Sequence, residues 1–227
     1  MSSSVTAFVL GYTGETGKAL LKQLSGDNYF SNIVLTGRRQ VDLEIFKLAD
    51  DGRFTQRVID FDEVEKYADD FKGCDVGFCC MGTTRGKGGA AHFVKVDRDY
   101  VVNSAKVAKD AGCSHFQVVT AYGADKNSSI LYNKTKGEVE EQLKNINFQR
   151  LSIFQPALLL GKREESRPLE TFFKVISFPF TKLFPTLGSV HFDVLARAMI
   201  YNTKQPTSEK VEVIDNKKIH EFSKLAE

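Results

Sequence analysis

Short apolar runs alternate along this chain with longer segments whose apolar residues recur at helical spacing. The first run, Val5–Leu10, is almost continuously apolar, which is typical of a strand buried on both faces of a parallel sheet. In the segment that follows, at about residues 15–24, Ala19, Leu20 and Leu24 form an apolar stripe. Repetition of this alternation predicts βαβ units and an α/β fold: a Rossmann-type, doubly wound parallel sheet with helices on both faces.

The same patterns place the remaining elements. Further strands are predicted at about residues 33–36, 57–59, 75–80, 115–120, 148–154 and 210–214. Further helices are predicted at about residues 64–71, 98–111, 129–144 and 192–201, with a short helix at the C-terminus. From about residue 157 the pattern is less regular. We therefore expect residues 1–227 to form one domain with a small C-terminal extension on its substrate or partner side.

Length and composition narrow the class of protein. A chain of 227 residues is long enough for one α/β domain and too short for two ordinary domains with separate cores. Its 42% hydrophobic and 26% charged residues exclude a disordered chain, and a net charge of +2 gives no general argument for nucleic-acid binding. No apolar run approaches the ~20 residues of a membrane-spanning helix, and we expect no signal peptide. We therefore expect a cytoplasmic protein, with the nucleus as an open alternative.

Neither the cysteines nor the histidines have the spacing of metal ligands. No Cys-x-x-Cys pair is present, and the four histidines are scattered along the chain. We therefore expect no metal site and four buried, reduced thiols: Cys74, Cys79, Cys80 and Cys113.

Three glycines join the first predicted strand to the first predicted helix. Gly11 permits a tight turn off the strand, Gly14 lets backbone amides approach a pyrophosphate, and Gly17 lets the helix pack closely on the sheet. Unpaired amides and the positive end of the helix dipole would hold the phosphates. The alternative is a flexible glycine-rich loop, but the position between an apolar strand and an amphipathic helix favours dinucleotide binding.

The residues after the second predicted strand indicate which dinucleotide binds. NAD-binding chains usually carry an acidic residue there, whereas this chain has Gly37-Arg38-Arg39. Two guanidinium groups suit a 2′-phosphate, so NADPH is favoured over NADH. The alternative is a pair of solvated surface arginines. Asp60 and Phe61, after the third strand, are expected to flank the adenine.

Tyr132 and Lys136 lie four residues apart on the helix predicted after the fifth strand, so they share one face. A lysine ammonium near a phenol favours the phenolate, which makes Tyr132 usable as a general acid for a carbonyl oxygen. Lys136 could also bond the nicotinamide ribose. The alternative is a surface tyrosine beside a solvated lysine, because this spacing is common by chance.

These motifs resemble the short-chain dehydrogenase/reductase superfamily in its atypical branch. Longer motifs narrow the resemblance to the Tat-interacting oxidoreductase family, whose vertebrate member is described as a tumour and metastasis suppressor. The resemblance covers about residues 8–220, and its most specific motifs are residues 78–87, 96–100, 123–126 and 136–140.

The resemblance implies NADPH binding together with partners in nuclear import, transcription and apoptosis. It places cofactor contacts on residues of the glycine turn, the arginine pair, the ends of later strands and the Tyr-x-x-x-Lys helix. These residues are Thr13, Gly14, Glu15, Thr16, Arg38, Arg39, Met81, Gly82, Tyr132, Lys136, Leu159 and Arg167.

The chain departs from the superfamily at the end of the fifth strand, where a serine usually orients the substrate carbonyl. Here Thr120 keeps a hydroxyl at the first position, but Ala121 loses it at the second. Two functions stay open. One is an NADPH-dependent reductase of a small carbonyl, with Tyr132 as acid/base, Lys136 tuning it and Thr120 orienting the substrate. The other is a regulatory protein that binds NADPH and acts through protein partners with little turnover.

Three further features of the sequence bear on the site and its surroundings. Tyr12 stands where a small residue is usual, and we expect its ring near the cofactor. The basic loop at residues 83–89 either closes over the cofactor or is an ordinary connection. The phenylalanine-rich stretch after Leu169 is expected to line a pocket or the core, with partner or membrane contact as alternatives.

Overall fold

A seven-stranded parallel sheet forms the centre of the computed structural model, which describes residues 4–48, 50–83, 88–161 and 188–226. Its strand order is β3-β2-β1-β4-β5-β6-β9, so the expected doubly wound Rossmann sheet is confirmed. The strands are β1 (Val5–Leu10), β2 (Phe30–Gly37), β3 (Phe54–Val58), β4 (Val76–Cys79), β5 (His115–Val119), β6 (Arg150–Gln155) and β9 (Val211–Asp215). A second, two-stranded parallel sheet pairs β7 (Leu158–Leu160) with β8 (Ser189–His191).

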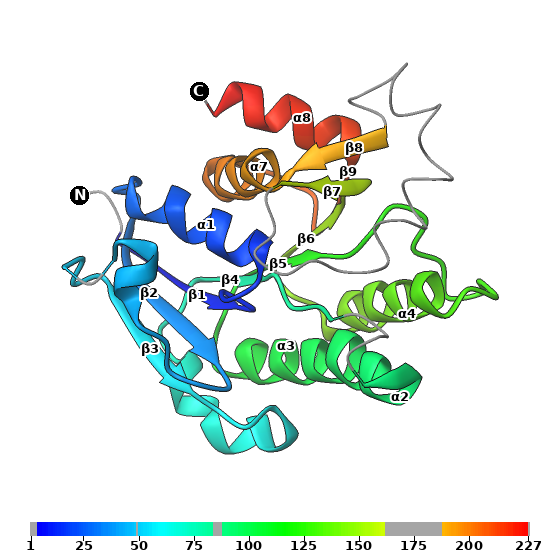
Figure 1. Ribbon diagram of the computed structural model, residues 1–227, viewed down its shortest axis with the longest axis horizontal. Helices are drawn as coiled ribbons and strands as arrows, with labels where there is room; N and C mark the ends of the chain where they lie inside the picture. Colours follow the sequence, from blue (N-terminus) through cyan, green and yellow to red (C-terminus); the bar gives the residue numbers. More distant parts are fainter. Residues whose placement is uncertain (1–3, 49, 84–87, 162–187, 227) are drawn as a thin grey trace.

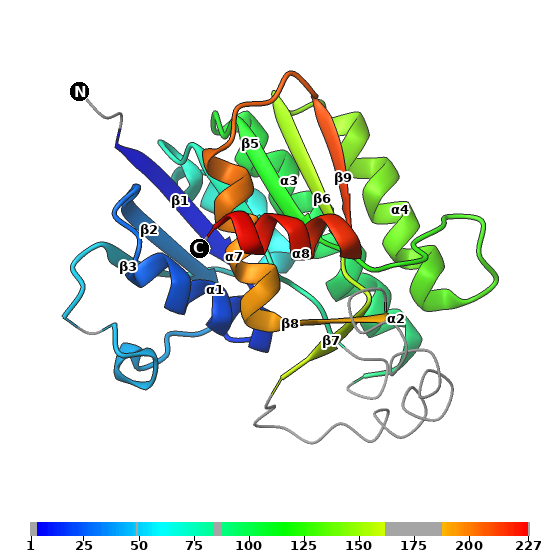
Figure 2. The ribbon, with the colours of Figure 1, turned by 90° about the horizontal axis from the view of Figure 1, so that it is seen from above.

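Helices cover both faces of the large sheet (Figures 1 and 2). On one face lie α1 (Glu15–Ser25), α7 (Phe192–Lys204) and α8 (Asn216–Leu225). On the other lie the 3-10 helix η2 (Phe61–Phe71), α3 (Tyr100–Asp110) and α4 (Leu131–Ile146). The short helix α2 (Gly89–Val94) and a π-helical turn, η4 (Lys95–Asp99), lead into α3, and η1 (Leu43–Phe46) follows β2. Thus α7, β9 and α8, all beyond residue 157, complete the sheet and its covering helices.

Burial of β1 on both faces explains its continuous apolar run. Ala7 and Val9 point into the core beneath α1 and α7, whereas Phe8 and Leu10 point into the core beneath η2 and α3. Successive side chains of a strand face opposite sides, so a strand covered on both sides has no polar positions to alternate.

Several predicted boundaries were wrong, for local reasons. The third strand lies at Phe54–Val58 rather than residues 57–59, because it pairs with β2 from Ile33 onward. The helix predicted at residues 64–71 is a 3-10 helix that begins at Phe61, where Asp60 caps the backbone amide of Asp62 at 2.9 Å. The helix predicted from residue 98 begins earlier, as α2 and the π turn. Strands β7 and β8 were not predicted, because three-residue strands carry no periodicity.

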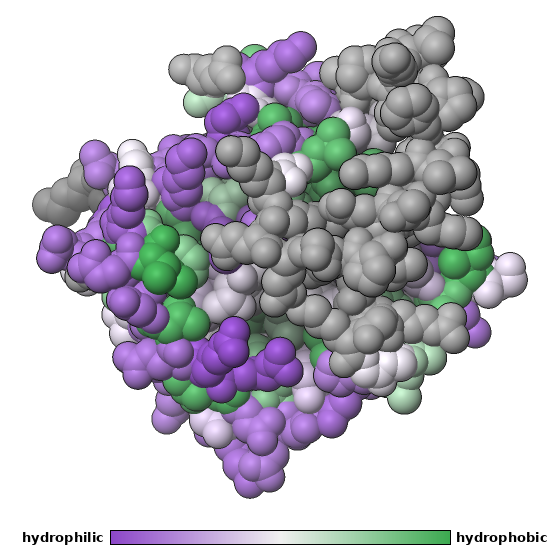
Figure 3. Space-filling view, viewed as in Figure 1, coloured by the Kyte–Doolittle hydropathy of each residue, from purple (hydrophilic) through white to green (hydrophobic). Residues whose placement is uncertain are grey.

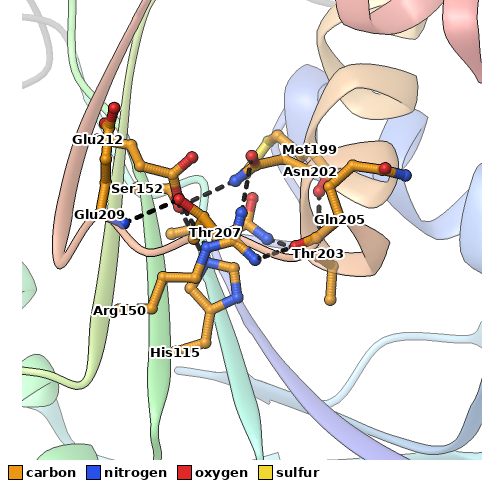
Figure 4. A network of polar contacts seen from close by, with 11 residues as sticks. His115, Arg150, Ser152, Met199, Asn202, Thr203, Gln205, Thr207, Glu209 and Glu212 are labelled. Atoms are coloured by element: carbon orange, nitrogen blue, oxygen red, sulfur yellow. Dashed lines mark hydrogen bonds and ion pairs between the residues drawn. The ribbon is translucent and has the colours of Figure 1, made fainter.

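A buried polar network ties the amino ends of β5, β6 and β9 to α7 (Figure 4). Arg150 donates through Nε to Glu212 Oε1 at 2.7 Å and through Nη2 to Asn202 Oδ1 at 3.0 Å. Ser152 Oγ donates to the same Glu212 oxygen at 3.0 Å and lies 2.8 Å from His115 Nε2. Burial, followed by the positive charge of Arg150, lowers the pKa of His115 to about 3, so this imidazole stays neutral.

The apolar side chains of the described residues are concentrated in the core. None of the described helices is both long enough and apolar enough to cross a bilayer. The face seen in Figure 3 carries hydrophilic side chains over much of its described area, with hydrophobic side chains in scattered patches.

Candidate functional site

The sheet changes winding direction between β1 and β4. From β1 the chain crosses to α1 on one face, and from β4 it proceeds to α2, η4 and α3 on the other. In open α/β sheets the crevice beyond the carboxyl ends of two such strands is the usual ligand site. The glycine turn follows β1 at this edge, and Met81 and Gly82 follow β4 beside it.

Close backbone approaches explain two of the three glycines. Gly11 has a φ of +77°, and a Cβ there would lie 2.7 Å from the carbonyl carbon of Cys80. A Cβ at Gly17 would lie 2.3 Å from the carbonyl oxygen of Gly11. Any side chain at either position would therefore push the turn away from β4 or lift α1 from the sheet.

The N-terminus of α1 is open to an anion. Gly14 is its N-cap residue, and no side chain of the described residues caps the first turn. A Cβ at Gly14 would meet nothing nearer than the Gly11 carbonyl oxygen at 3.4 Å, so one side of the turn is open. Thr13 is exposed and Thr16 is buried, while Glu15 pairs with Lys18 at 3.3 Å. Free amides, the helix dipole and this open side fit a pyrophosphate.

Arg38 and Arg39 lie directly after β2, and both are exposed. Neither guanidinium forms an ion pair with a carboxylate among the residues that the structure describes. Both side chains are therefore free to meet an anion, and their contact with a phosphorylated ribose stays a prediction.

The expectation that the ring of Tyr12 lies near the cofactor was wrong. The ring is almost fully buried, with 1% of its surface exposed, and it packs in the core between α1 and β2. Its hydroxyl lies 3.1 Å from the carbonyl oxygen of Arg39 and 3.0 Å from Gln56 Oε1. From the core, the Tyr12 hydroxyl therefore holds the backbone that follows β2.

Asp60 and Phe61 occupy different environments. Asp60 is exposed after β3 and caps η2, whereas the ring of Phe61 is buried and stacks on Tyr100 with 5.4 Å between ring centroids. An adenine could thus meet Asp60 directly, but it could meet Phe61 only through the backbone. Contact of either residue with adenine stays a prediction.

A buried ion pair lies beside Gly82. Lys136 Nζ on α4 is 2.8 Å from Asp97 Oδ1, and the two side chains are only 6% and 1% exposed. The backbone amide of Thr83 donates to the other Asp97 oxygen at 2.6 Å. Asp97 lies in the π-helical turn η4, a wider turn of the kind often found at functional sites. Sequence analysis missed Asp97, because nothing in its spacing separates a buried aspartate from a solvated one.

This environment keeps Lys136 charged. Burial opposes the ammonium, but the Asp97 carboxylate and then the Tyr132 phenol more than offset it, so the pKa of Lys136 lies above its ordinary value. Tyr132, one turn earlier on α4, is 42% exposed and stacks on Phe93 with 5.8 Å between centroids. The structure thus brings Tyr132 and Lys136 together, with the phenol open to solvent.

Thr120 is hydrogen-bonded away from the crevice. Its Oγ1 donates to Glu140 Oε1 at 2.6 Å, and Glu140 also accepts from Gln155 Nε2 at 2.9 Å. Thr120 and Glu140 are both buried. A hydroxyl has one proton to donate, so in this arrangement Thr120 has none left for a substrate carbonyl. Glu140 follows Tyr132 and Lys136 at the same four-residue spacing on α4, a signal that sequence analysis could have used.

Of the remaining predicted site residues, the structure describes Leu159 but not Arg167. Leu159 lies in β7 and packs against the core beneath α1 and α7. Arg167 and the phenylalanine-rich stretch lie outside the described residues, as do residues 84–87 of the loop after β4.

The four cysteines are free thiols, and Cys80 is only partly buried, whereas the other three are buried as expected. Burial raises the pKa of Cys79 to about 11, so this thiol is not a nucleophile at neutral pH. Among the described residues, no group of three or more His, Cys, Asp or Glu side chains is placed to hold a metal ion.

Comparison with known proteins identifies the family of this chain. The NAD(P)H-binding family matches residues 11–154. Protein HTATIP2 of Rattus norvegicus is 44% identical over 219 residues, which cover 96% of this chain and 89% of that protein. Protein fmp52 of Aspergillus niger, which is named mitochondrial, is 32% identical over 95% of this chain and 97% of its own length. The expected resemblance to the Tat-interacting oxidoreductase family is thereby confirmed.

Solved structures share the fold at low sequence identity. The dTDP-glucose 4,6-dehydratase DesIV of Streptomyces venezuelae, solved with NAD and TYD bound, superposes with a TM-score of 0.70. It is 15% identical, over 98% of this chain and 80% of that one. A UDP-glucuronic acid 4-epimerase of Bacillus cereus in complex with NAD has a TM-score of 0.67 at 16% identity, over 93% of this chain and 76% of that one.

Proposed function

We propose that this chain, which belongs to the NAD(P)H-binding family and is similar to rat protein HTATIP2, is an NADPH-dependent oxidoreductase acting on a small carbonyl. The single observation that carries the proposal is the arrangement of three groups around one crevice. These are the open N-terminus of α1, the unpaired arginines after β2, and the exposed phenol of Tyr132 beside the charged Lys136.

The proposed contact of each residue with the nucleotide follows from its charge and position. Backbone amides at Gly14 and Glu15 would hold the pyrophosphate, and Arg38 and Arg39 would hold the 2′-phosphate of the adenosine ribose. Met81 and Gly82, beside the glycine turn, would line the path between the two ends of the dinucleotide. Asp60, Thr13, Thr16 and Leu159 complete the proposed contacts.

The proposed chemistry needs a proton as well as a hydride. Bound NADPH supplies the hydride that reduces a carbonyl carbon. Tyr132 would donate its phenolic proton to the carbonyl oxygen, and Lys136 would stabilise the phenolate that remains. Asp97 fixes the ammonium of Lys136 at 2.8 Å and limits its positive influence, because the pair is neutral overall. Tyr132 therefore acts with a positioned but partly neutralised lysine.

A second function is favoured by a separate observation. Thr120 donates its proton to Glu140, and Ala121 has no hydroxyl, so neither position after β5 can orient a carbonyl. A protein with an intact cofactor site and a poor substrate site would bind NADPH and act by contacting other proteins. In this second proposal the nucleotide is a structural or redox-reporting ligand.

Turnover by matched tyrosine variants tests the first proposal against the second. NADPH consumption is followed with a panel of aldehydes, ketones and quinones for the wild type, Tyr132→Phe and Tyr122→Phe. Tyr122 is 73% exposed on the loop after β5 and serves as the control phenol. We expect Tyr132→Phe to lose turnover by about 10²- to 10⁴-fold, the usual contribution of a general acid, with Tyr122→Phe unchanged. NADPH binding without turnover of any panel member by the wild type would favour the binding protein.

A further inference from the structure

The backbone of residues 38–41 carries the two arginines but lies outside the sheet. The last ladder bond runs from the Ile59 amide to the Gly37 carbonyl at 2.9 Å. Beyond it, within the part of the chain that the structure describes, only the side chains of Tyr12 and Gln56 hold this backbone by hydrogen bonds.

The side-chain amide of Gln56 pairs with the backbone of this loop as a neighbouring strand would. Its Oε1 accepts from the Val41 amide at 2.9 Å, and its Nε2 donates to the Val41 carbonyl at 2.8 Å. The Tyr12 hydroxyl lies between this amide and the loop, 3.0 Å from Gln56 Oε1 and 3.1 Å from the Arg39 carbonyl. One phenol and one amide thus hold the loop at Arg39 and at Val41, while the last ladder bond holds it at Gly37.

The sequence leaves space for this arrangement at Gly37. A Cβ at Gly37 would lie 2.8 Å from Cε1 of the Tyr12 ring. The large residue in the glycine turn and the missing side chain at the end of β2 are therefore complementary. This explains why Tyr12 stands where a small residue is usual without blocking the nucleotide crevice.

We propose that Tyr12 and Gln56 form a polar clamp that pre-orients Arg38 and Arg39 and so determines the preference for the 2′-phosphorylated nucleotide. This inference rests on the proposed NADPH site. An ordered backbone removes part of the entropy that two long side chains would otherwise lose on binding a phosphate. The clamp acts on the backbone of the arginine loop, because the Tyr12 hydroxyl and the Gln56 amide bond to Arg39 and Val41 and the Tyr12 ring is only 1% exposed.

The ionisation state of Tyr12 is consistent with a donor role. Burial raises the pKa of its phenol, and the positive charge of Arg39 offsets this only in part. The hydroxyl therefore keeps its proton at neutral pH and donates it to one of its two acceptors at a time.

Nucleotide affinities test the proposal directly. NADPH and NADH dissociation constants are measured by the fluorescence of the reduced nicotinamide for the wild type, Tyr12→Phe, Gln56→Met and Arg39→Ala. Tyr29→Phe is the matched control, because Tyr29 lies at the other end of β2 and is 38% exposed. Loss of one hydrogen bond predicts that Tyr12→Phe weakens NADPH about fivefold and NADH less than about twofold. Gln56→Met should act in the same direction.

Each outcome bears on a different statement. An unchanged ratio of NADPH to NADH affinity in both Tyr12→Phe and Gln56→Met would overturn the clamp, even if Arg39→Ala abolishes the preference. Equal affinity of the wild type for both nucleotides, or affinity for neither, would overturn the NADPH proposal and the clamp with it.

A second readout needs no nucleotide. Trypsin cleaves after arginine, and the exposed Arg38 and Arg39 are substrates only when their backbone leaves its place. We expect cleavage at this site to be about fivefold faster in Tyr12→Phe than in Tyr29→Phe, with thermal unfolding midpoints compared for both. Equal cleavage rates in folded variants would contradict the clamp.

Discussion

Two buried ion pairs lie at opposite ends of the same sheet, and they differ in how completely their polar atoms are bonded. At the amino ends, Arg150 and Glu212 belong to a network in which the guanidinium and the carboxylate each have several partners. At the carboxyl ends, the ammonium of Lys136 contacts one carboxylate, that of Asp97, among the described residues. A closed network stabilises the fold, whereas a cation with donors to spare can still bind a ligand.

The largest effect is expected from breaking the closed network. Glu212→Ala leaves a buried guanidinium without its carboxylate, which should lower the free energy of unfolding by about 3–5 kcal/mol in urea denaturation. NADPH affinity should not change, because this end of the sheet is remote from the glycine turn. Glu209→Ala, an exposed glutamate nearby, is the control and should change stability by less than about 0.5 kcal/mol. A loss of NADPH affinity in folded Glu212→Ala would contradict a purely structural role for the network at the amino ends of the strands.

Acid should weaken the same network through His115. Its folded pKa of about 3 lies below the ordinary value of 6.5, so the unfolded chain binds a proton that the folded chain does not. Stability is therefore intact above pH 6.5 and falls as the pH drops towards 3. The expected loss from this group at pH 5 is about 2 kcal/mol. His115→Gln should flatten the pH dependence of the urea midpoint between pH 6.5 and 5. An unaltered slope would show that His115 is not the responsible group.

At the carboxyl ends, removing a charge should alter ligand binding as well as stability. Asp97→Asn keeps an oxygen for the Thr83 amide but takes away the partner that fixes Lys136. We expect the NADPH dissociation constant to rise about tenfold, since an incorrectly placed lysine no longer bonds the nucleotide ribose. Fluorescence titration measures the change, with Asp99→Asn as control, since Asp99 is a partly exposed neighbour on η4 that pairs with Arg98 instead of Lys136. An unaltered constant would mean that this ion pair is structural, like its counterpart.

The smallest effect concerns the hydroxyl that the substrate site lacks. Ala121→Ser adds a donor directly after Thr120, whose own proton is already bonded to Glu140. If the chain is a reductase, the added hydroxyl should raise kcat for the best substrate of the panel by about three- to tenfold. Ala121→Val, which adds bulk without a donor, is the control. A gain in both variants would assign the effect to shape.

The features that could be predicted from the sequence are those that impose a periodic pattern or a steric requirement on it. Continuous burial of β1 and the backbone approach at Gly11 leave visible traces, namely an apolar run and an obligatory glycine. The pairing of Asp97 with Lys136 and of Thr120 with Glu140 leaves no such trace, although the four-residue spacing of Tyr132, Lys136 and Glu140 marks one face of α4. Which carboxylate meets Lys136 or Thr120 depends on how η4 and α4 pack, and that arrangement joins residues 39 and 20 positions apart in the chain.

The buried ring of Tyr12 is an instructive error. The identity of the residue in the glycine turn was visible, but its direction was not, because the turn places consecutive side chains on opposite sides. The complementary signal was Gly37, 25 positions later, which pairs with the ring only in the folded sheet.

Strand β9 is the edge strand that completes the large sheet. It pairs with β6 from Leu151 to Gln155, and it supplies Glu212 to Arg150. A polypeptide that stopped after α7 would still contain every residue of the proposed nucleotide site described above. In such a product β6 would nevertheless be an unpaired edge strand, and the guanidinium of Arg150 would lack the carboxylate of Glu212. A premature stop codon between α7 and β9 should therefore act as a loss-of-function allele through degradation of the product.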